Sequence, residues 1–165
     1  MPSLVIAVDD PRADDVRALL ERHLAFAAEV TPVGHVHALG VERLVDPAVT
    51  FFSARVAGEL VGVGALRELD DAHGELKSMH TAAAARGRGV GRAMVEHLIG
   101  VARRRGYRRV SLETGTGDAF AAARALYAAA GFTPCRPFGD YTANRYSTCM
   151  TRTLDSVAEE ADRPG

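Results

Sequence analysis

The chain has 165 residues, of which 47% are hydrophobic and 25% are charged, and its formal net charge at pH 7 is −1. This composition is typical of a globular domain, and the nearly balanced charge gives no global field that would favour nucleic acid or a membrane surface. The chain contains no apolar run long enough for a transmembrane helix, and residues 1–8 lack the basic start and long apolar core of a signal peptide, so we expect a cytoplasmic protein.

Cys135 and Cys149 are the two cysteines, and their scattered positions are typical of a protein whose thiols stay reduced. A disulfide between them is the less favoured alternative. No internal repeat or linker divides the chain. We therefore expect a single domain over residues 1–154, followed by a polar C-terminal tail over residues 155–165.

The first half of the chain predicts a strand, two helices and then a run of strands. Asp10 is placed to cap the first helix, with Pro11 at the first helical position and apolar side chains at helical spacing as far as His23. The expected elements are a strand at 4–8, a helix beginning at Pro11, a short helix at 38–45, hairpin strands at 50–56 and 60–66, a turn at 70–74 and a strand at 75–81.

The second half predicts two helices and three strands. Gly106 is placed to end the first helix in a left-handed cap, and Asp118 is placed to cap the second, which stops at Gly131. The expected elements are a helix at 90–105, a strand at 109–114, a helix at 118–130 and two strands at 132–137 and 146–154 that can pair as a hairpin.

The segment Arg86-Gly87-Arg88-Gly89-Val90-Gly91 stands between the expected strand at 75–81 and the helix that follows. Its glycines leave the backbone bare, so a ligand can approach closely and the chain can adopt positive φ angles. The N–H groups of the helix's first turn have no partners within the helix and carry the positive end of its dipole. With the guanidinium groups of Arg86, Arg88 and Arg92 beside them, they are suited to a phosphate or diphosphate.

Two other phosphate-binding loops and a plain turn are the alternatives for this segment. A dinucleotide-binding loop needs a third glycine where this chain has Arg92, and it follows an initial parallel strand, not a hairpin. A P-loop needs a Gly-Lys-Ser/Thr sequence, which the chain lacks. A tight turn explains one glycine but not three that alternate with arginine and valine.

Arg86-x-x-Gly89-x-Gly91, which follows Glu-Leu-Lys-Ser-Met-His-Thr, resembles the coenzyme A signature of the GNAT superfamily of N-acetyltransferases. Leu126-Tyr127-x-x-x-Gly131-Phe132 resembles the second signature of that superfamily. The order of the expected elements also matches, so the resemblance covers roughly residues 3–154. It implies an α/β fold, of the α+β kind, in which a mixed sheet of about seven mostly antiparallel strands has helices on both faces.

The resemblance implies acetyl-CoA as co-substrate, bound mostly through backbone groups. The parallel strands at 75–81 and 109–114 would separate and leave a cleft in which the pantetheine arm pairs with the first strand. The backbone N–H near His80 would face the thioester oxygen. The cofactor-binding residues expected on this basis are Met79, His80, Thr81, Arg86, Gly87, Arg88, Gly89, Val90, Gly91, Arg92 and Arg124.

One position departs from the family pattern. Many relatives carry an asparagine seven residues before the signature tyrosine, where it contacts the cofactor, and this chain has Phe120 there. Arg124 is the expected source of a replacement contact.

The implied reaction moves an acetyl group to a primary amine of a small molecule, by direct attack through a tetrahedral intermediate. Tyr127 stands at the position of the superfamily's thiolate-facing tyrosine, where it would donate a proton or a hydrogen bond to the departing sulfur. Its plainer explanation is core packing between Phe120 and Phe132. Because a phenol has a higher pKa than a typical thiol, we expect Tyr127 to stabilise the departing sulfur by a hydrogen bond more than by complete proton transfer.

The amine must also lose a proton before it attacks. Glu75 is the first choice for the base, because its spacing from Gly89 matches that of the strand glutamate in the histone-acetylating branch. Strand alternation places Glu75, Lys77 and Met79 on one face, and a structural ion pair between Glu75 and Lys77 is an equally weighted explanation. Glu113 is the second choice, and His80 is the third.

The acceptor stays open at this level, because both acidic and basic side chains occur in the segments that usually line it. Those residues are His23, His35, His37, Arg43, Phe138, Asp140, Tyr141 and Arg145. His35 and His37 are too few ligands for a metal site, so no metal is expected. The arginines at 103–109 are explained better by a helix C-terminus than by a nucleic-acid site, so no nucleic acid is expected either.

The alternatives for the function are a protein or peptide N-acetyltransferase, a non-catalytic acyl-CoA sensor and another nucleotide-binding module. Relatives often form homodimers, but the sequence shows no interface.

Overall fold

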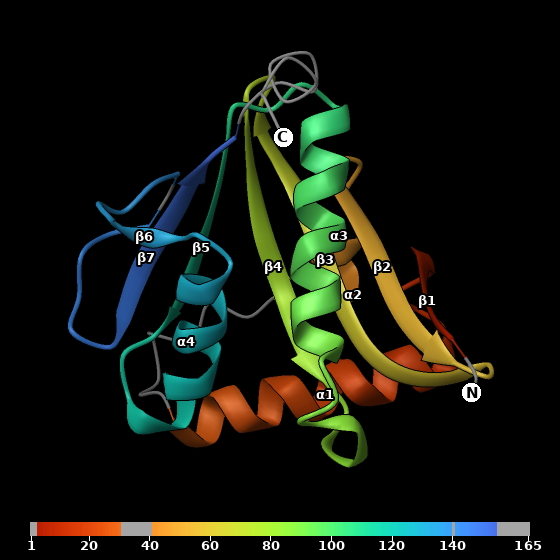
Figure 1. The fold of residues 1–165 in the computed structure, drawn as a ribbon. Helices are drawn as coiled ribbons and strands as arrows, with labels where there is room; N and C mark the ends of the chain where they lie inside the picture. The colour runs from red at the N-terminus through yellow and green to blue at the C-terminus, as the bar shows by residue number, and fades with distance from the viewer. Residues whose placement is uncertain (1–2, 31–40, 140, 155–165) are drawn as a thin grey trace.

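A computed structural model describes residues 3–30, 41–139 and 141–154 (Figure 1). One seven-stranded sheet has the order β1-β2-β3-β4-β5-β7-β6. Its strands are β1 (Leu4–Val8), β2 (Val49–Val56), β3 (Glu59–Asp70), β4 (His73–Thr81), β5 (Arg109–Gly115), β6 (Thr133–Cys135) and β7 (Ser147–Thr153). The helices are α1 (Asp14–Val30), α2 (Val41–Leu44), α3 (Val90–Arg104) and α4 (Ala121–Ala129), with short 3₁₀ turns η1 (Ala83–Ala85) and η2 (Asp118–Phe120). The expected mixed, mostly antiparallel α/β fold is confirmed.

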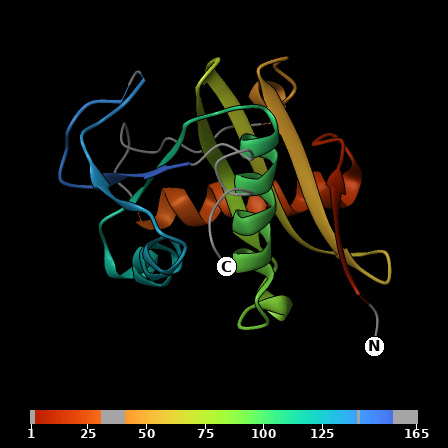
Figure 2. The same ribbon diagram turned by 45° about the horizontal axis from the view of Figure 1, so that its top comes forward.

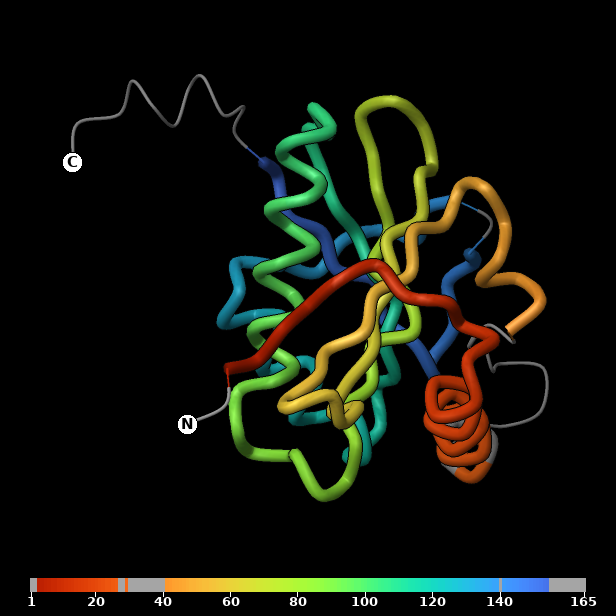
Figure 3. Tube along the Cα trace, turned by 90° about the vertical axis from the view of Figure 1, so that its right-hand side faces the viewer, coloured from red at the N-terminus to blue at the C-terminus, as the bar shows by residue number. Residues whose placement is uncertain are grey.

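The sheet lies between α3 on one face and α1 on the other (Figure 3). The core on the α3 face includes Met94 and Leu98, and the core on the α1 face includes Val16, Leu19 and Leu20. Each fully buried side chain of this kind stabilises the fold by about 1.5–3 kcal/mol. None of the helices in the described residues combines the length and apolar character needed to cross a bilayer.

Helix α3 ends as its sequence predicts. Gly106 has a φ of +81°, and its N–H donates to the Arg103 carbonyl at 3.0 Å. The N–H of Tyr107 donates to the Ala102 carbonyl at 3.0 Å, which completes the hydrogen-bond pattern of a left-handed glycine cap.

Strands β4 and β5 are the only parallel neighbours in the described sheet, and they pair over a short stretch. The paired positions are His73 with Arg109, Gly74 with Val110 and Glu75 with Ser111. Beyond Glu75 the two strands diverge, as Figure 1 shows below the upper ends of β4 and β5. Residues 76–81 therefore present about 17 Å of strand edge that no neighbouring strand covers on the β5 side.

A bulge in β4 overturns one expectation about strand alternation. Ser78 has a φ of +54°, and the β3–β4 register shifts between Lys77 and His80. The extra residue moves Met79 to the α3 face, where its sulfur lies beside Gly64 and Met94. Met79 therefore does not share a face with Glu75 and Lys77.

Two residues that the sequence predicts as helix caps, Asp10 and Asp118, do not cap a helix in the structure. Asp10 caps a turn: its Oδ1 accepts a hydrogen bond from the Arg12 N–H at 2.9 Å, and α1 begins only at Asp14. Residues 118–120 form η2, and α4 begins at Ala121 without a side-chain cap. The aromatic ring of Phe120 packs against Gly115, which accounts for the tight turn before α4.

Several strand boundaries also differ from the expectation. Strand β3 continues to Asp70, and β4 begins at His73, so the turn is shorter than residues 70–74. Cross-strand pairing holds this polar end of β3, where apolar alternation gives no strand signal. Strand β6 is shorter than residues 132–137, but it pairs with β7 in antiparallel fashion as expected.

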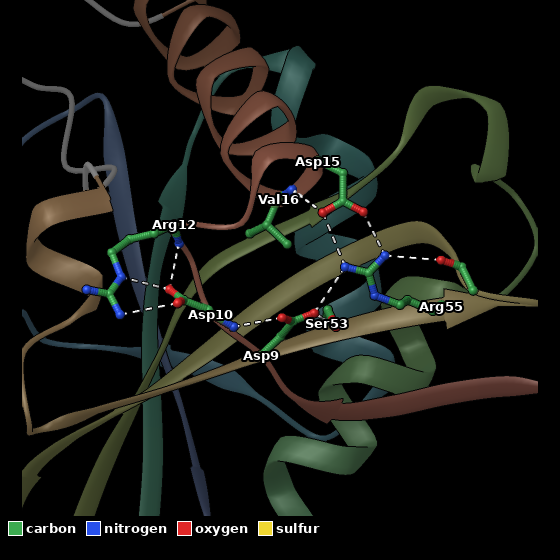
Figure 4. Close-up of polar contacts among 8 residues, drawn as sticks. Asp9, Asp10, Arg12, Asp15, Val16, Ser53 and Arg55 are labelled. Atoms are coloured by element: carbon green, nitrogen blue, oxygen red, sulfur yellow. Dashed lines mark hydrogen bonds and ion pairs between the residues drawn. The ribbon is translucent and has the colours of Figure 1, made fainter.

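Arg55 on β2 joins the start of α1 to the sheet (Figure 4). Its Nη1 lies 2.7 Å from Asp15 Oδ2 and donates to the Gly58 carbonyl at 3.1 Å, and its Nη2 lies 3.1 Å from Asp9 Oδ2. The hydrogen bond from Arg55 lowers the pKa of Asp15. Burial opposes the shift of Asp9, but hydrogen bonds from Ser53, the Asp10 N–H and Arg55 outweigh it and lower the pKa of that carboxyl.

We expect Arg55→Met to lower the free energy of unfolding by about 1–2 kcal/mol at pH 7, because charge-assisted hydrogen bonds are lost. The two carboxyls have lowered pKa values in the folded state, so their contribution is present above the ordinary value of 3.8 and is lost as pH falls below it. Urea unfolding at pH 7 and near pH 3 should show the difference between wild type and variant shrinking in acid. A difference of equal size at both pH values would contradict this role.

Candidate active site

The glycine loop has the backbone geometry that an anion-binding loop needs. Gly87 and Gly89 have φ angles of +78° and +81°, and Gly89 is the N-cap of α3. Its carbonyl accepts the N–H of Ala93 at 3.0 Å, so the N–H groups of residues 90–92 precede the first intrahelical bond. A Cβ added at Gly87 or Gly89 would meet no atom within 4 Å, so the loop's outer side is open.

Gly91 brings the two sequence signatures together. A Cβ at this position would lie 3.1 Å from Leu126 Cδ2 and 3.7 Å from Thr81 Oγ1. The end of β4, the first turn of α3 and the signature helix α4 therefore meet at one glycine. A larger residue at this position would crowd the Leu126 side chain of α4.

The arginines around the loop differ in their exposure and in their hydrogen-bond partners. Arg86 and Arg88 are exposed, and Arg92 pairs with Glu96 at 3.1 Å on the surface of α3. Arg124 donates from Nη1 to the carbonyl groups of Gly115 and Gly117 at 2.7 and 2.9 Å. Arg124 thus ties the loop after β5 to α4, and that part of its guanidinium is already used.

Phe120 occupies the position that departs from the family pattern. Its ring packs against Gly115 of β5 and lies edge-on to Phe26 of α1, with 5.6 Å between ring centroids. Figure 2 shows α1 crossing the far face of the sheet towards α4. Phe120 therefore makes an apolar contact between α1 and η2.

His80 lies on the α1 face of β4, because the bulge at Ser78 reverses the alternation. Its Nδ1 is 3.2 Å from Nδ1 of His23 on α1. Burial, together with the charges of His23, Arg86 and Arg22, lowers the pKa of His80 to about 4, and burial lowers the pKa of His23. A neutral imidazole with so low a pKa is a weak proton acceptor at pH 7, which places His80 behind Glu75 as a base.

Glu75 is buried at the point where β4 and β5 begin to separate, with 1% of its surface exposed. Its Oε2 lies 3.0 Å from Lys77 Nζ and 2.6 Å from Tyr141 Oη. Lys77 Nζ also donates to Tyr141 Oη at 2.6 Å. Glu75 is therefore half of a buried ion pair with Lys77, and it also lies where the two strands begin to separate. The choice between a base and a structural charge stays a prediction.

Glu113 lies on β5, two residues beyond Ser111, the last residue of β5 that pairs with β4, and is half-buried. Its charge is one cause of the raised pKa values of Tyr141 and Cys149, which follow mainly from burial. Glu113 is thus a neighbour of the Glu75 group, on the same side of the sheet.

Tyr127 is buried in α4, and its ring lies edge-on to Phe132 with 6.1 Å between centroids. Burial raises the pKa of Tyr127 to about 12, so the phenol stays protonated at physiological pH. Packing against Phe132 matches the plainer explanation, whereas Phe120 packs with Gly115 and Phe26. The structure gives the Tyr127 hydroxyl no hydrogen bond within the described part of the chain.

Three of the expected acceptor-lining residues, His35, His37 and Asp140, lie outside the described residues. Within residues 3–30, 41–139 and 141–154, no three side chains of the types that ligate metal converge. Cys135 and Cys149 face each other across β6 and β7 as free thiols, and burial raises both pKa values.

Residues 16–132 match the sequence profile of the Acetyltransferase (GNAT) family. This chain belongs to the GNAT family. The segment that resembles the family's coenzyme A signature is the loop before α3, and the segment that resembles its second signature is α4 with the turn at Gly131.

Two curated relatives support this GNAT assignment along almost the whole chain. The chain is 44% identical to an uncharacterized N-acetyltransferase, YsnE, of Bacillus subtilis strain 168, over 90% of this chain and 99% of the relative. It is 34% identical to an IAA acetyltransferase of Azospirillum brasilense, over 93% of this chain and all of the relative.

Solved structures show the same fold. A protein of Klebsiella pneumoniae, provisionally assigned as an acyl-CoA N-acyltransferase, superposes with a TM-score of 0.74 at 24% identity, over 92% of this chain and 98% of that one. A GNAT acetyltransferase of Elizabethkingia anophelis with acetyl-CoA bound superposes with a TM-score of 0.67 at 17% identity, over 92% of this chain and 98% of that one. The GNAT fold is therefore common to this chain and to a protein that binds acetyl-CoA.

Proposed function

We propose that this GNAT protein transfers the acetyl group of acetyl-CoA to a primary amine of a small molecule, by direct attack on the thioester. The observation that carries the proposal is the separation of β4 from β5. The uncovered edge of β4 runs from buried Glu75 at one end to the glycine loop at the other. That edge offers backbone hydrogen bonds to an extended arm, and the loop offers amides to a diphosphate.

The residues that would hold acetyl-CoA fit these two tasks. Amides of residues 87–92 would bind the diphosphate, helped by the exposed guanidinium groups of Arg86 and Arg88. The backbone of Met79 and Thr81 would pair with the arm, and the N–H near His80 would face the thioester oxygen. Arg124 would act mainly by holding the loop after β5, since its Nη1 bonds to Gly115 and Gly117. Bound acetyl-CoA would supply the activated acetyl group.

We assign the chemical roles to Glu75, with Glu113 as the second choice, and to Tyr127. Glu75, with Glu113 as the second choice, would accept the proton that the amine must lose. Tyr127 would donate a hydrogen bond to the departing sulfur. Its raised pKa, about 12, makes complete transfer of its proton to a thiolate unfavourable, because an ordinary thiol has the lower pKa. We place this chemistry in the cytoplasm, in keeping with the two free thiols.

An amine-panel assay that detects the released CoA thiol tests this function. The panel should contain alkylamines, arylamines, amino acids and a lysine-containing peptide, and IAA belongs in it because of the name of the Azospirillum relative. We expect acetyl-CoA-dependent turnover with a small amine. Binding of acetyl-CoA without turnover on any member would favour an acyl-CoA sensor, and turnover only on peptides would favour a protein acetyltransferase.

We expect Tyr127→Phe to lower kcat about 10- to 100-fold, because the departing sulfur loses its hydrogen-bond donor. The Kd for acetyl-CoA should change less than about twofold, since loss of a transition-state contact leaves ground-state binding intact. Steady-state kinetics and calorimetry measure the two quantities. An unchanged kcat would leave only the packing role against Phe132.

A further inference from the structure

Glu75 is too deeply enclosed to meet an acceptor amine directly. It is 1% exposed, and both of its described polar contacts, from Lys77 and from Tyr141, are made to the same carboxylate oxygen. A general base must lie within hydrogen-bond reach of the proton that it removes, or within reach of one bridging group. A bridging group is therefore required if Glu75 is the base.

Tyr141 is the group that stands beside Glu75 on the side of the late loop. Phe138 and Tyr141 lie in the loop between β6 and β7, and both contact side chains of β4. The ring of Phe138 lies 5.7 Å from that of His73 and 5.2 Å from that of Tyr141, so the loop is anchored on the strand. Tyr141 is half-buried, whereas Glu75 is enclosed, so Tyr141 is the more accessible residue of the pair.

The hydrogen-bond directions around this hydroxyl are fixed by the donors. An ammonium group can only donate, so Lys77 donates to Tyr141 Oη at 2.6 Å. A carboxylate can only accept, so Tyr141 donates its proton to Glu75 Oε2 at 2.6 Å. Lys77 also lies 5.3 Å from the centroid of the Tyr141 ring. The phenolic proton therefore points at the carboxylate, and an ammonium stabilises negative charge on the phenolic oxygen.

We propose that Tyr141 is a catalytic proton relay, through which an acceptor ammonium passes its proton to Glu75. This inference rests on the proposed acetyl-transfer function. The ammonium gives one proton to Tyr141 Oη as the Tyr141 proton moves to Glu75 Oε2, leaving a neutral amine, a neutral phenol and a protonated Glu75. The amine then attacks the thioester, its second proton goes to the departing sulfur, and Glu75 releases the first proton to water. Lys77 keeps its charge throughout.

The other titratable groups around Tyr141 keep its hydroxyl protonated, as the proton relay requires. Burial raises the pKa of Tyr141, and the charges of Glu75, of Glu113 on β5 and of Cys149 on β7 raise it further. The phenol is therefore neutral at pH 7 and acts by passing a proton, not as a standing phenolate. His23 and His80 bond to each other on the same face of the sheet, farther along β4.

The test is the pH dependence of kcat/KM for Tyr141→Phe with the best alkylamine from the panel, measured between about pH 6.5 and pH 10. The change removes only the hydroxyl. We expect a loss of at least about tenfold near pH 7 that shrinks below about threefold as the pH approaches the pKa of the amine, because a neutral amine needs no relay. The Kd for acetyl-CoA should stay within about twofold.

Tyr107→Phe is the matched control. Tyr107 Oη also bonds to a carboxylate, Glu68 Oε1 at 3.0 Å, but Tyr107 belongs to the core on the α3 face of the sheet, so its loss should not produce a pH-dependent deficit. A second variant, with Glu75→Gln and Lys77→Met together, keeps the Tyr141 hydroxyl and removes the proton acceptor. The relay predicts that kcat/KM of this double variant also falls at least about tenfold near pH 7 and approaches the wild-type value at high pH. It also predicts that adding Tyr141→Phe to the double variant lowers kcat/KM by less than about a further threefold.

The outcomes separate this inference from the proposed function. A wild-type protein that acetylates amines while Tyr141→Phe matches it, or loses the same factor at every pH, overturns the relay alone. The absence of a shrinking deficit in the Glu75→Gln/Lys77→Met variant also overturns it, even if Tyr141→Phe fails to fold. A wild-type protein that binds acetyl-CoA but acetylates no amine contradicts the relay and the proposed function together.

Discussion

Glu75→Gln alone should lower the free energy of unfolding by about 3–5 kcal/mol, because it leaves the Lys77 ammonium buried without its counter-charge. The two side chains are 2% and 7% exposed and lie 3.0 Å apart, so water cannot compensate for the lost partner. Lys77→Met alone should cost a similar amount. The double variant should recover most of that stability, because it removes both charges together.

Activity distinguishes the two roles that Glu75 can have. If Glu75 is the base, the double variant stays at least about tenfold below wild type in kcat near pH 7 although its stability is recovered. Urea unfolding and steady-state kinetics on the same four proteins give both quantities. Recovery of turnover along with stability would show that Glu75 is only a structural charge.

Gly89→Val should weaken acetyl-CoA binding at least tenfold, or by about 1.4 kcal/mol. The new side chain would occupy the open side of the loop where the diphosphate is expected, and a β-branched residue at a φ of +81° distorts the first turn of α3. Calorimetric titration with acetyl-CoA measures the change.

Gly58→Val is the control for backbone strain. Gly58 has a φ of +82° and open space around it, as Gly89 does, but it lies in the hairpin between β2 and β3. Both variants should lose similar thermal stability, whereas Gly58→Val should keep the wild-type Kd. Equal affinities of both variants for acetyl-CoA would show that the diphosphate does not bind at this loop.

The sequence predicts the glycine loop and α3 well because local chemistry determines them. Gly89 begins the helix, Gly106 ends it, and apolar side chains at helical spacing fix the face between them. The same local signals place the strands of the sheet within a few residues. The caps at Asp10 and Asp118 were wrong: a turn held by Asp10 precedes α1, and η2, whose Phe120 packs on Phe26 of α1, precedes α4.

The acceptor side of the candidate site depends on contacts that no local pattern contains. Ser78 carries no sequence signal for a left-handed backbone, yet its bulge reverses the faces of Met79 and His80. Tyr141 reaches Glu75 across 66 residues of sequence, through a loop held by aromatic packing. The sequence names Tyr141 only as a lining residue, and its polar neighbours become visible once the sheet is assembled.

A crystal structure of the protein with acetyl-CoA is the most direct test of the central claim, that backbone amides at the start of α3 bind the diphosphate. We expect phosphate oxygens within about 3 Å of the N–H groups of residues 87–92 and the pantetheine arm along the uncovered edge of β4. A diphosphate bound away from this loop, or an arm that does not follow β4, would contradict the account.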